Sequence, residues 1–413
     1  MLRTSKHTLK FCNKKKHEII VNLINDYRKL VQEIIDDIWK NGYNDFSVQK
    51  NKLNLLSFLD SKFLNKFDFE YTERLKQCAG KQAIGMLSAA TEKRRRQLWK
   101  LKQLQKEGIN AKFLQRKINI FPLIKPNASN INLNLDSRFV DFDFENQNKF
   151  LCFVKLSSFK KGQNVKIPIS HSSIFDKWND KGLLKQSIML SKNNIFLIFE
   201  SKVPKKTIGE TIGCDQGITD VVKLSDNQAI PKYQDKYNLS DVQKILSRRK
   251  KGSIGFRKAQ TFRKNIINWS INQLNFSNIK ELRLEKLENV RKGKKSSRFL
   301  SHWTYTKIND KLKRVSEEKG FLIKEIPNEF RSQRCSECGW VRKANRKGKT
   351  FCCTKCACTL DADLNAASNL SLDLYEIPKW VRLKKINLSG FYWNSEGLFS
   401  SSQESIVPDT KKE

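Results

Sequence analysis

The sequence predicts a multidomain protein of the α+β class. Its N-terminal part is expected to be a split β-barrel-like domain with an inserted helical block, and its C-terminal part an α/β domain with an inserted zinc ribbon. Of the 413 residues, 38% are hydrophobic, which is enough for two or three cores. Apolar residues recur at helical spacing in some regions and alternate in others. Six cysteines lie between residues 335 and 358, at spacings typical of a zinc ribbon.

The N-terminal half is expected to be a β-domain made of two segments, 1–14 and 121–205, with a helical domain, 15–120, between them. Residues 5–12 partly alternate and predict the first strand. Short β-branched or aromatic segments after Pro122 predict the other strands. The helical domain is therefore expected to be inserted between the first and second strands of one β-domain.

The charge of the chain indicates its class of partner. It carries 80 Lys+Arg against 42 Asp+Glu, a net charge of +38. A charge of this size, spread along the chain, favours a polyanionic partner whose counterion release supplies affinity. No acid lies between Lys93 and Lys102, although a solvated helix face is the alternative reading there. The candidate nucleic-acid-binding residues are Arg94, Arg95, Arg96, Trp99, Lys100, Arg248, Arg249, Lys250 and Lys251.

The sequence also predicts the compartment. Its apolar runs are too short to span a bilayer, and its first residues lack the hydrophobic segment of a secretory signal. Six of the ten cysteines cluster at metal spacing, which is typical of a reducing compartment. We therefore expect a cytoplasmic protein with no membrane partner; if its polyanionic partner is DNA, it would be associated with the nucleoid when bound.

Three acids at the ends of predicted elements are the candidate catalytic residues. Asp215 and Glu285 each follow a predicted strand, and Asp363 begins a predicted helix. Carboxylates from separate elements can hold two divalent ions about 4 Å apart for phosphodiester hydrolysis, and Mg²⁺ prefers such oxygen ligands. Each acid alone could also have an ordinary structural role. Asp215 could form a turn, Glu285 could be a surface charge, and Asp361 or Asp363 could cap the helix.

Two Cys-x-x-Cys pairs separated by a short basic hairpin predict a zinc site with four thiolates. The first pair is Cys335 and Cys338. The second pair is less certain, because Cys352 and Cys358 flank the standard choice of Cys353 and Cys356. A pairing of Cys352 with Cys356 would need a longer loop.

In the order and spacing of its motifs, the C-terminal half resembles the transposon-associated TnpB proteins and the miniature type V-F CRISPR nucleases. The matching segments are Ile212-Gly-Cys-Asp215-Gln-Gly217, Leu284-Glu285-Lys-Leu287, Ser332-Gln-Arg-Cys335-Ser-Glu-Cys338-Gly339, Phe351-Cys-Cys353-Thr-Lys-Cys356 and Asp363-Leu-Asn365-Ala-Ala367-Ser-Asn369-Leu. Lys251-Gly-Ser253 and Trp303 also lie where the family has similar residues. The resemblance covers roughly residues 206–375, and the N-terminal half shares only the layout of a split β (wedge) domain that holds a helical recognition block.

The resemblance implies an RNase H-like RuvC nuclease domain over 206–330, a zinc-ribbon insertion that binds target nucleic acid over 331–360, and a last RuvC helix over 361–376. Residues 377–413 are expected to form a loosely ordered tail. The resemblance implies that two Mg²⁺ ions are held by Asp215, Glu285 and Asp363, and one structural Zn²⁺ by Cys335, Cys338, Cys353 and Cys356. Asp363 is preferred over Asp361 because the family's acid precedes x-Asn-Ala-Ala. Two departures are Cys214, where the family has an aliphatic residue, and Ala357, where it commonly has glycine.

The expected function is that of an RNA-guided DNA endonuclease, either a compact type V-F CRISPR effector or a transposon TnpB. The expected partners are a guide RNA and target double-stranded DNA, bound by a monomer or by an asymmetric homodimer on one guide RNA. Two alternatives remain open: an RNA-guided DNA-binding regulator without cleavage, and a DNA-strand-transfer transposase. Co-purified RNA would separate the transposase from the others, and cleavage would separate the nuclease from the regulator.

Overall fold

A computed structural model describes residues 1–43, 61–106, 108, 111–120, 124–145, 149–287, 305–378, 381 and 386–406. The chain divides into two compact units, residues 1–202 and 203–413. Trp303, which carried part of the resemblance, lies outside the described residues. Within the described part of the chain, the helices are all too short or too polar to cross a membrane.

The first unit contains two antiparallel sheets. One has the strand order β1-β7-β6-β2 and the other the order β3-β4-β5. The bounds are β1 Leu2–Thr8, β2 Leu133–Leu135, β3 Val140–Asp143, β4 Cys152–Lys160, β5 Gln163–Ile169, β6 Leu183–Ser191 and β7 Asn194–Glu200, with α5 Ser173–Asn179 between β5 and β6. β1 pairs with β7 from Leu2↔Glu200 to Thr8↔Asn194. The sheet therefore joins the start of this unit to its end.

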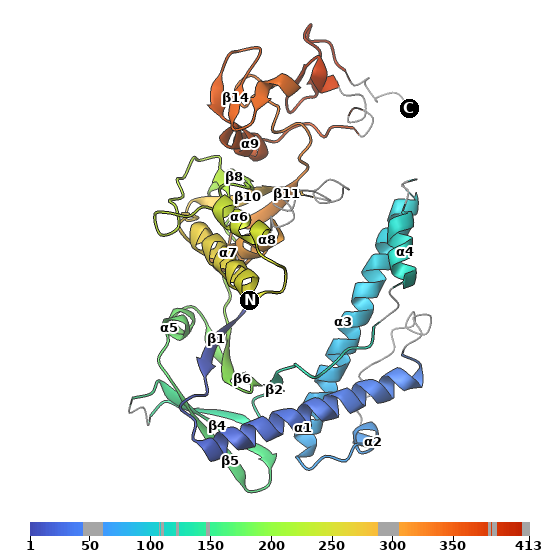
Figure 1. Ribbon diagram of the computed structural model, residues 1–413, viewed down its shortest axis with the longest axis vertical. Helices are drawn as coiled ribbons and strands as arrows, with labels where there is room; N and C mark the ends of the chain where they lie inside the picture. Colours follow the sequence, from blue (N-terminus) through green and yellow to red (C-terminus); the bar gives the residue numbers. More distant parts are fainter. Residues whose placement is uncertain are drawn as a thin grey trace. The chain divides into compact units, whose positions relative to one another are not determined.

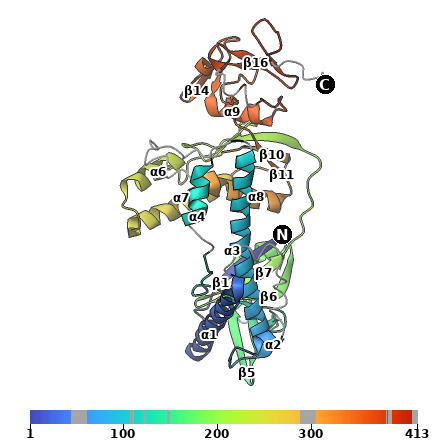
Figure 2. The ribbon, with the colours of Figure 1, turned by 90° about the vertical axis from the view of Figure 1, so that its right-hand side faces the viewer.

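Helices fill the interval between β1 and β2. They are α1 Lys14–Ile38 with a π-helical extension Trp39–Tyr43, α2 Ser61–Leu64, α3 Glu73–Lys106 and α4 Lys112–Ile120. Asn13 starts α1, because its side chain accepts a hydrogen bond from the Lys16 backbone N–H. The buried face of α1 and the strands of both sheets belong to one hydrophobic core. Figures 1 and 2 show α4 lying beside the end of the long helix α3.

The second unit is built on a mixed sheet of order β11-β10-β8-β9. β8, β10 and β11 are parallel, and β9 runs antiparallel to β8. The bounds are β8 Glu210–Asp215, β9 Lys223–Leu224, α6 Leu239–Arg248, α7 Ile254–Asn272, β10 Ile279–Glu285, α8 Tyr305–Lys319, β11 Leu322–Ile326 and α9 Ala362–Ser371. The sheet shares one core with α6, α7 and α8. α9 packs on β8, as Figure 1 shows.

Two small three-stranded sheets complete this unit. They are formed by residues 331–361, called the ribbon segment below, and by the chain that follows α9. Their orders are β13-β14-β15 and β12-β16-β17. The bounds are β12 Trp340–Val341, β13 Arg346–Lys347, β14 Thr350–Cys352, β15 Thr359–Asp361, β16 Phe391–Trp393 and β17 Leu398–Phe399, with 3-10 turns at Lys343–Asn345 and Ile386–Leu388. The second sheet thus combines a ribbon strand with two strands from beyond residue 377.

The expectation of a loosely ordered tail from residue 377 is wrong for residues 391–399. β16 pairs with β12, and Phe391, Trp393 and Leu398 are buried in a small core with Val341. The indole Nε1 of Trp393 donates a hydrogen bond to the Tyr375 carbonyl at 2.9 Å. This segment is rich in aromatic residues, but its apolar runs, Phe391–Trp393 and Leu398–Phe399, are shorter than the runs that predict a strand. It becomes ordered because it completes the edge of a sheet that the ribbon segment begins.

Candidate active site and metal centre

Asp215 and Glu285 are the last residues of two neighbouring parallel strands. Leu284 of β10 pairs with Cys214 of β8, so the register brings the next residue of each strand to the same edge of the sheet. The carboxyl ends of parallel strands are where α/β proteins place ligands. The two acids therefore lie side by side because of the strand register.

Asp363 reaches the same place from α9. The N-cap of this helix is Asp361, whose Oδ1 accepts hydrogen bonds from the backbone N–H groups of Asp363 at 3.0 Å and of Leu364 at 2.9 Å. Of the two acids considered for capping, Asp361 thus makes the capping bonds. Asp363 lies in the first turn, and its side chain lines a cavity with Asp215 and Glu285.

Gly213 explains how α9 comes so close to β8. A Cβ atom at this position would lie 1.9 Å from the Ala367 carbonyl oxygen and 2.7 Å from the Ser371 nitrogen. Both atoms belong to α9. Any side chain on Gly213 would therefore push the helix, and Asp363 with it, away from the strand that ends in Asp215.

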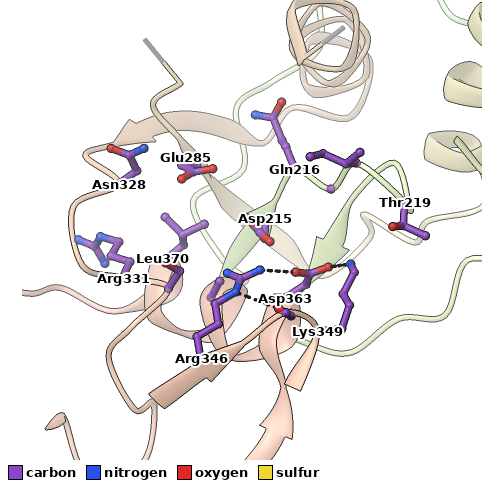
Figure 3. A pocket seen from close by; sticks show the side chains of 15 residues that line it. Asp215, Gln216, Thr219, Glu285, Asn328, Arg331, Arg346, Lys349, Asp363 and Leu370 are labelled. Carbon is purple, nitrogen blue, oxygen red and sulfur yellow. Dashed lines mark hydrogen bonds and ion pairs between the residues drawn. The ribbon is translucent and has the colours of Figure 1, made fainter. Parts of the chain in front are cut away.

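The three acids share a cavity of about 480 Å³. Figure 3 shows Asp215 at its centre, with Glu285 and Asp363 on either side. The remaining lining residues are Gln216, Gly217, Ile218, Thr219, Asn328, Arg331, Ser332, Arg346, Gly348, Lys349, Ala366 and Leu370. Three convergent carboxylates beside amide groups form a set of oxygen donors that suits Mg²⁺. The kind of donor therefore fits the divalent ions that the sequence predicted, whereas the only group among the described residues whose ligand atoms lie close enough together for one ion is that of Cys335, Cys338, Cys353 and Cys356.

Burial and mutual repulsion perturb the acids. Burial, reinforced by the charges of Glu285 and Asp363, raises the pKa of Asp215 to about 7. Burial also raises the pKa of Glu285, opposed by a hydrogen bond from the Asn328 side chain. Each shift means that the ionised form is disfavoured at this place. A bound cation would remove that penalty, which is a property expected of a metal-binding carboxylate cluster.

Two cations from the ribbon segment contact the third acid. Arg346 Nη2 lies 3.0 Å from Asp363 Oδ1, and Lys349 Nζ pairs with Asp363 Oδ2. Both pairs are drawn as dashed lines in Figure 3. The sequence interpretation noted only a basic hairpin between the cysteine pairs and missed these two residues. The signal was Arg346-Lys-Gly-Lys349, whose approach to Asp363 depends on the pairing of β14 with β15.

The four cysteines of the two Cys-x-x-Cys pairs converge. The Sγ atoms of Cys335, Cys338, Cys353 and Cys356 all lie within 4.8 Å of one another. Two of the separations are 3.7 Å, from Cys335 to Cys356, and 3.6 Å, from Cys338 to Cys353. Zinc–sulfur bonds of about 2.3 Å in a tetrahedron imply separations of about 3.8 Å. The cluster therefore fits a zinc ion.

The two extra cysteines are not part of this cluster. Cys352 lies on β14, is exposed, and accepts a hydrogen bond from Thr359 Oγ1 at 3.7 Å. Cys358 contributes its carbonyl to the Cys353 N–H at 2.9 Å. The geometry thus favours the two-residue spacer of Cys353 and Cys356 over a pairing that uses Cys352.

Each cysteine pair forms a tight knuckle that ends in a left-handed residue. Gly339 has φ 79° and Ala357 has φ 57° at equivalent places after the second cysteine of each pair. Their N–H groups donate to the carbonyls of Cys335 and Cys353, both at 3.0 Å. A hydrogen bond from the Cys358 backbone N–H lowers the pKa of Cys356 to about 7. That shift favours the thiolate form, which is the form that binds metal.

Asparagines on α9 tie the cysteine cluster to the acid site. Asn365 Oδ1 accepts from the Ser336 N–H at 3.0 Å, inside the first knuckle. Asn369 Oδ1 accepts from Arg334 Nη1 at 2.6 Å. Both asparagines are fully buried. One helix therefore carries Asp363 into the cavity and, through its buried amides, holds the chain around the first two cysteines.

The candidate nucleic-acid contacts occupy two places. Arg94, Arg95, Arg96, Trp99 and Lys100 lie on α3, where Trp99 is 64% exposed. Glu92 pairs with Arg95 at 2.9 Å and with Arg96 at 3.0 Å, so the stretch from Lys93 to Lys102 is partly neutralised by an acid just before it. Arg248, Arg249, Lys250 and Lys251 are exposed at the end of α6 and in the turn before α7. Within the second unit, the four residues of the α6–α7 turn do not line the cavity of the three acids.

The fold and the cysteine cluster define a class, namely a mixed α/β protein with a site compatible with a zinc ribbon. Residues 305–370 match the family model described as "Cas12f1-like, TNB domain". The Cas12f1 endodeoxyribonuclease of Sulfoacidibacillus thermotolerans is 39% identical over 92 residues, covering 22% of this chain and 21% of that relative. A TnpB-like protein of Aquifex aeolicus is 32% identical over 92 residues, covering 21% of this chain and 30% of that relative. The alignments thus span less than a third of either relative.

Solved structures extend the likeness at the level of the fold. A Cas12f1–sgRNA–target DNA complex matches with a TM-score of 0.55 and 14% identity, over 90% of this chain and 98% of that one. The mini RNA-guided endonuclease CRISPR-Cas_phi3 matches with a TM-score of 0.51 and 9% identity, over 90% of this chain and 92% of that one. Together with the sequence matches, they confirm the resemblance to the family of TnpB proteins and miniature type V-F CRISPR nucleases.

Proposed function

We propose that the protein is an RNA-guided, Mg²⁺-dependent DNA endonuclease with an RNase H-like RuvC domain. The observation that carries the proposal is the convergence of Asp215, Glu285 and Asp363 on one cavity. The net charge of +38 supports polyanionic partners. Relatives matched by sequence are named endodeoxyribonucleases, and the Cas12f1 structure of similar fold contains a guide RNA and target DNA.

In this proposal Asp215, Glu285 and Asp363 hold two Mg²⁺ ions. When bound, the ions supply an activated water and neutralise charge on the leaving oxygen. Asn328 orients the Glu285 carboxylate through its hydrogen bond. Arg346 and Lys349 place positive charge at the cavity wall, where it would attract the scissile phosphate and compensate Asp363.

The four clustered cysteines would hold one structural Zn²⁺. Zinc would supply much of the folding energy of the ribbon segment, because its own hydrophobic cluster is small. The ribbon segment would then present Arg346 and Lys349 to the active site. Its proposed role is to bind target nucleic acid beside the catalytic acids.

The remaining assignments belong to the same proposal. Residues 1–14 and 121–205 would form the wedge domain, 15–120 the recognition domain, 206–330 and 361–376 the RuvC domain, and 331–360 the nucleic-acid-binding insertion. Guide RNA and target DNA would contact the exposed cations of α3 and of the α6–α7 turn. A CRISPR effector and a transposon TnpB fit these features equally, and a repeat–spacer array or a transposon end beside the gene would separate them.

The proposal is tested by purifying the protein from its native locus, sequencing the RNA that accompanies it, and assaying cleavage of DNA that matches this RNA. We expect a structured RNA, and cleavage that requires Mg²⁺ and is lost in Asp215→Ala. RNA-guided binding without cleavage by the wild type would favour a regulator. Strand transfer without any RNA would favour a transposase.

A further inference from the structure

Gln216 directly follows the first catalytic acid and is buried, with 4% of its surface exposed. Its Nε2 donates a hydrogen bond to Oδ1 of Asn309 on α8 at 2.8 Å. In Figure 3 its side chain points away from that of Asp215. The residue after Asp215 is thus attached to a helix, whereas Asp215 itself is the last residue of β8.

A second buried glutamine contacts the same loop from the other side. Gln243 of α6 is fully buried, and its Nε2 donates to the Ile218 carbonyl at 3.4 Å. The backbone N–H of Leu239, at the start of α6, donates to the Thr219 carbonyl at 3.0 Å. The loop that lines the cavity from Gln216 to Thr219 is therefore held between α8 and α6.

Both glutamines carry an unusual feature. Their Oε1 atoms are buried and have no hydrogen-bond partner among the described residues. A buried acceptor without a donor is unfavourable, and a leucine of similar size would avoid that cost. Leucine would also remove one hydrogen bond, to Asn309 Oδ1 or to the Ile218 carbonyl, and because this loss opposes the gain, the net effect of leucine on fold stability should be small. Leucine cannot replace the directional hydrogen bonds that the Gln216 and Gln243 amides donate to Asn309 and to the Ile218 carbonyl.

We propose that Gln216 is a positioning residue, which holds the loop after Asp215 against α8 so that the Asp215 carboxylate stays aimed into the cavity, and that Gln243 supports the same loop from α6. The proposal rests on the proposed function and deepens it. Metal-binding carboxylates must be held within about 0.5 Å of their productive positions. Asp215 is the last paired residue of β8, opposite Lys223 of β9, so the loop attachment supplies the restraint on its C-terminal side.

The test uses the full-length protein loaded with guide RNA. Its variants are Gln216→Leu, Gln216→Asn and the exchanged pair Gln216→Asn with Asn309→Gln, which keeps two amides of the same total length. Gln273→Leu is the matched control, because Gln273 is exposed and donates only within its own helix, to the Trp269 carbonyl at 3.4 Å. Terbium luminescence reports ion binding without cleavage, with Asp215→Ala as background. Thermal unfolding and the kcat and KM of cleavage complete the measurements.

For Gln216→Leu we expect terbium affinity and kcat to fall about tenfold, as is typical when a supporting contact of a metal ligand is lost. KM for target DNA should be unchanged, and the melting temperature should change little. The exchanged pair should recover most of the loss, and Gln273→Leu should behave as the wild type. Parallel losses of stability and activity would instead indicate a merely structural role.

Wild-type terbium affinity and kcat in Gln216→Leu would overturn the inference. The inference would also be overturned if the exchanged pair folds but recovers neither terbium affinity nor kcat. If the single variants fail to fold, the result for the exchanged pair decides. A wild type that does not cut with its guide would overturn the proposed function instead. In that case the terbium affinities of the same variants still decide whether Gln216 positions Asp215.

Discussion

The acid cavity and the cysteine cluster lie in the same unit and are built in opposite ways. The four sulfurs come from two knuckles that are each four residues long, and only the hairpin of β13 and β14 separates the two knuckles along the chain. The three carboxylates come from β8, β10 and α9, and they meet only because of strand register and the absence of a side chain at Gly213. One site is local, whereas the other is a product of the tertiary fold.

Their electrostatics are alike in one respect and differ in another. Burial raises the pKa of Asp215 and also that of Cys335 and Cys338. The pKa of Asp215 is further raised by neighbouring carboxylates, whereas a backbone N–H lowers the pKa of Cys356. The acid cavity is therefore strained by charge when no cation is bound, and Arg346 and Lys349 partly relieve that strain. The ribbon segment, which carries the cysteine cluster, thus also supplies two cations that pair with Asp363.

The largest effect should follow from removing a single acid. Asp215→Ala, Glu285→Ala or Asp363→Ala should each reduce cleavage at least about 1,000-fold, or about 4 kcal/mol of transition-state stabilisation. Nucleic-acid affinity and zinc content should be nearly unchanged, because phosphate contacts dominate binding. The control is Asp361→Ala, which removes the helix cap at a cost of about 1 kcal/mol but should still cut. Cleavage by Asp363→Ala and none by Asp361→Ala would show that the third acid is misassigned.

Disruption of the cysteine cluster should be visible in the zinc content of the protein. Wild-type protein should contain one zinc per chain by elemental analysis, and Cys338→Ser should lose it. Because Arg346 and Lys349 lie on the ribbon segment, cleavage should also fall, by about 10-fold or more. Cys352→Ser is the matched control, since its sulfur is outside the cluster, and it should keep its zinc. Loss of zinc in Cys352→Ser alone would contradict the assignment of Cys353.

Gly213→Ala should damage the acid site while leaving the cysteine site intact. The added methyl group would overlap the Ala367 carbonyl, so the free energy of unfolding should fall by about 1–3 kcal/mol or more, and cleavage should fall with it. Zinc content should not change. Gly85→Ala on α3 is the control, because a Cβ there meets nothing within 4 Å and alanine favours a helix by about 1 kcal/mol. If urea titrations gave Gly213→Ala and Gly85→Ala the same free energy of unfolding, the close approach of α9 to β8 would be refuted.

The raised pKa of Asp215 predicts a pH dependence of the acid site. In metal-free protein the folded state holds this proton more tightly than the unfolded chain. Its contribution to stability should therefore decline as pH rises from 3.8 to about 7, and be absent in Asp215→Asn. Mg²⁺ must displace the proton, so Mg²⁺ affinity by calorimetry should weaken up to about 10-fold per pH unit below pH 7. An affinity that is flat between pH 5 and pH 7 would contradict this prediction.

The smallest expected effect concerns the left-handed residue that ends each cysteine knuckle. Ala357 occupies the left-handed region at φ 57°, where its Cβ is strained and glycine is not. Ala357→Gly should therefore stabilise the ribbon segment by about 0.5–1 kcal/mol, measured by resistance to zinc removal with a chelator. Gly339→Ala, at the equivalent place with φ 79°, should have the opposite effect. Faster zinc loss in Ala357→Gly would be the contrary result.

The same contrast explains what could be predicted from the sequence. Cysteine spacing is a local signal, and the structure brings together the four sulfurs that the two-residue spacer selects. Asp215, Glu285 and Asp363 were recognisable as acids at element ends, and they line one cavity. Their convergence, however, depends on pairing between distant strands, which composition and periodicity do not encode.

The features that the sequence interpretation missed are all tertiary. Arg346 reaches Asp363 across a turn of the ribbon segment, and Gln216 reaches Asn309 on a helix far along the chain. β16 is ordered because it pairs with β12, whereas its own run of three aromatic residues is too short to predict a strand. Each of these depends on a partner that no short window of sequence contains.

The most direct test of the central claim is to change the guide. Protein stripped of RNA, then loaded with guides for two different sites on one plasmid, should cut each site only with its own guide and only with Mg²⁺ present. Asp215→Ala loaded in the same way should bind but not cut. Cleavage at one unchanged position whichever guide is loaded, or by thoroughly RNA-free protein, would contradict the account of an RNA-guided nuclease.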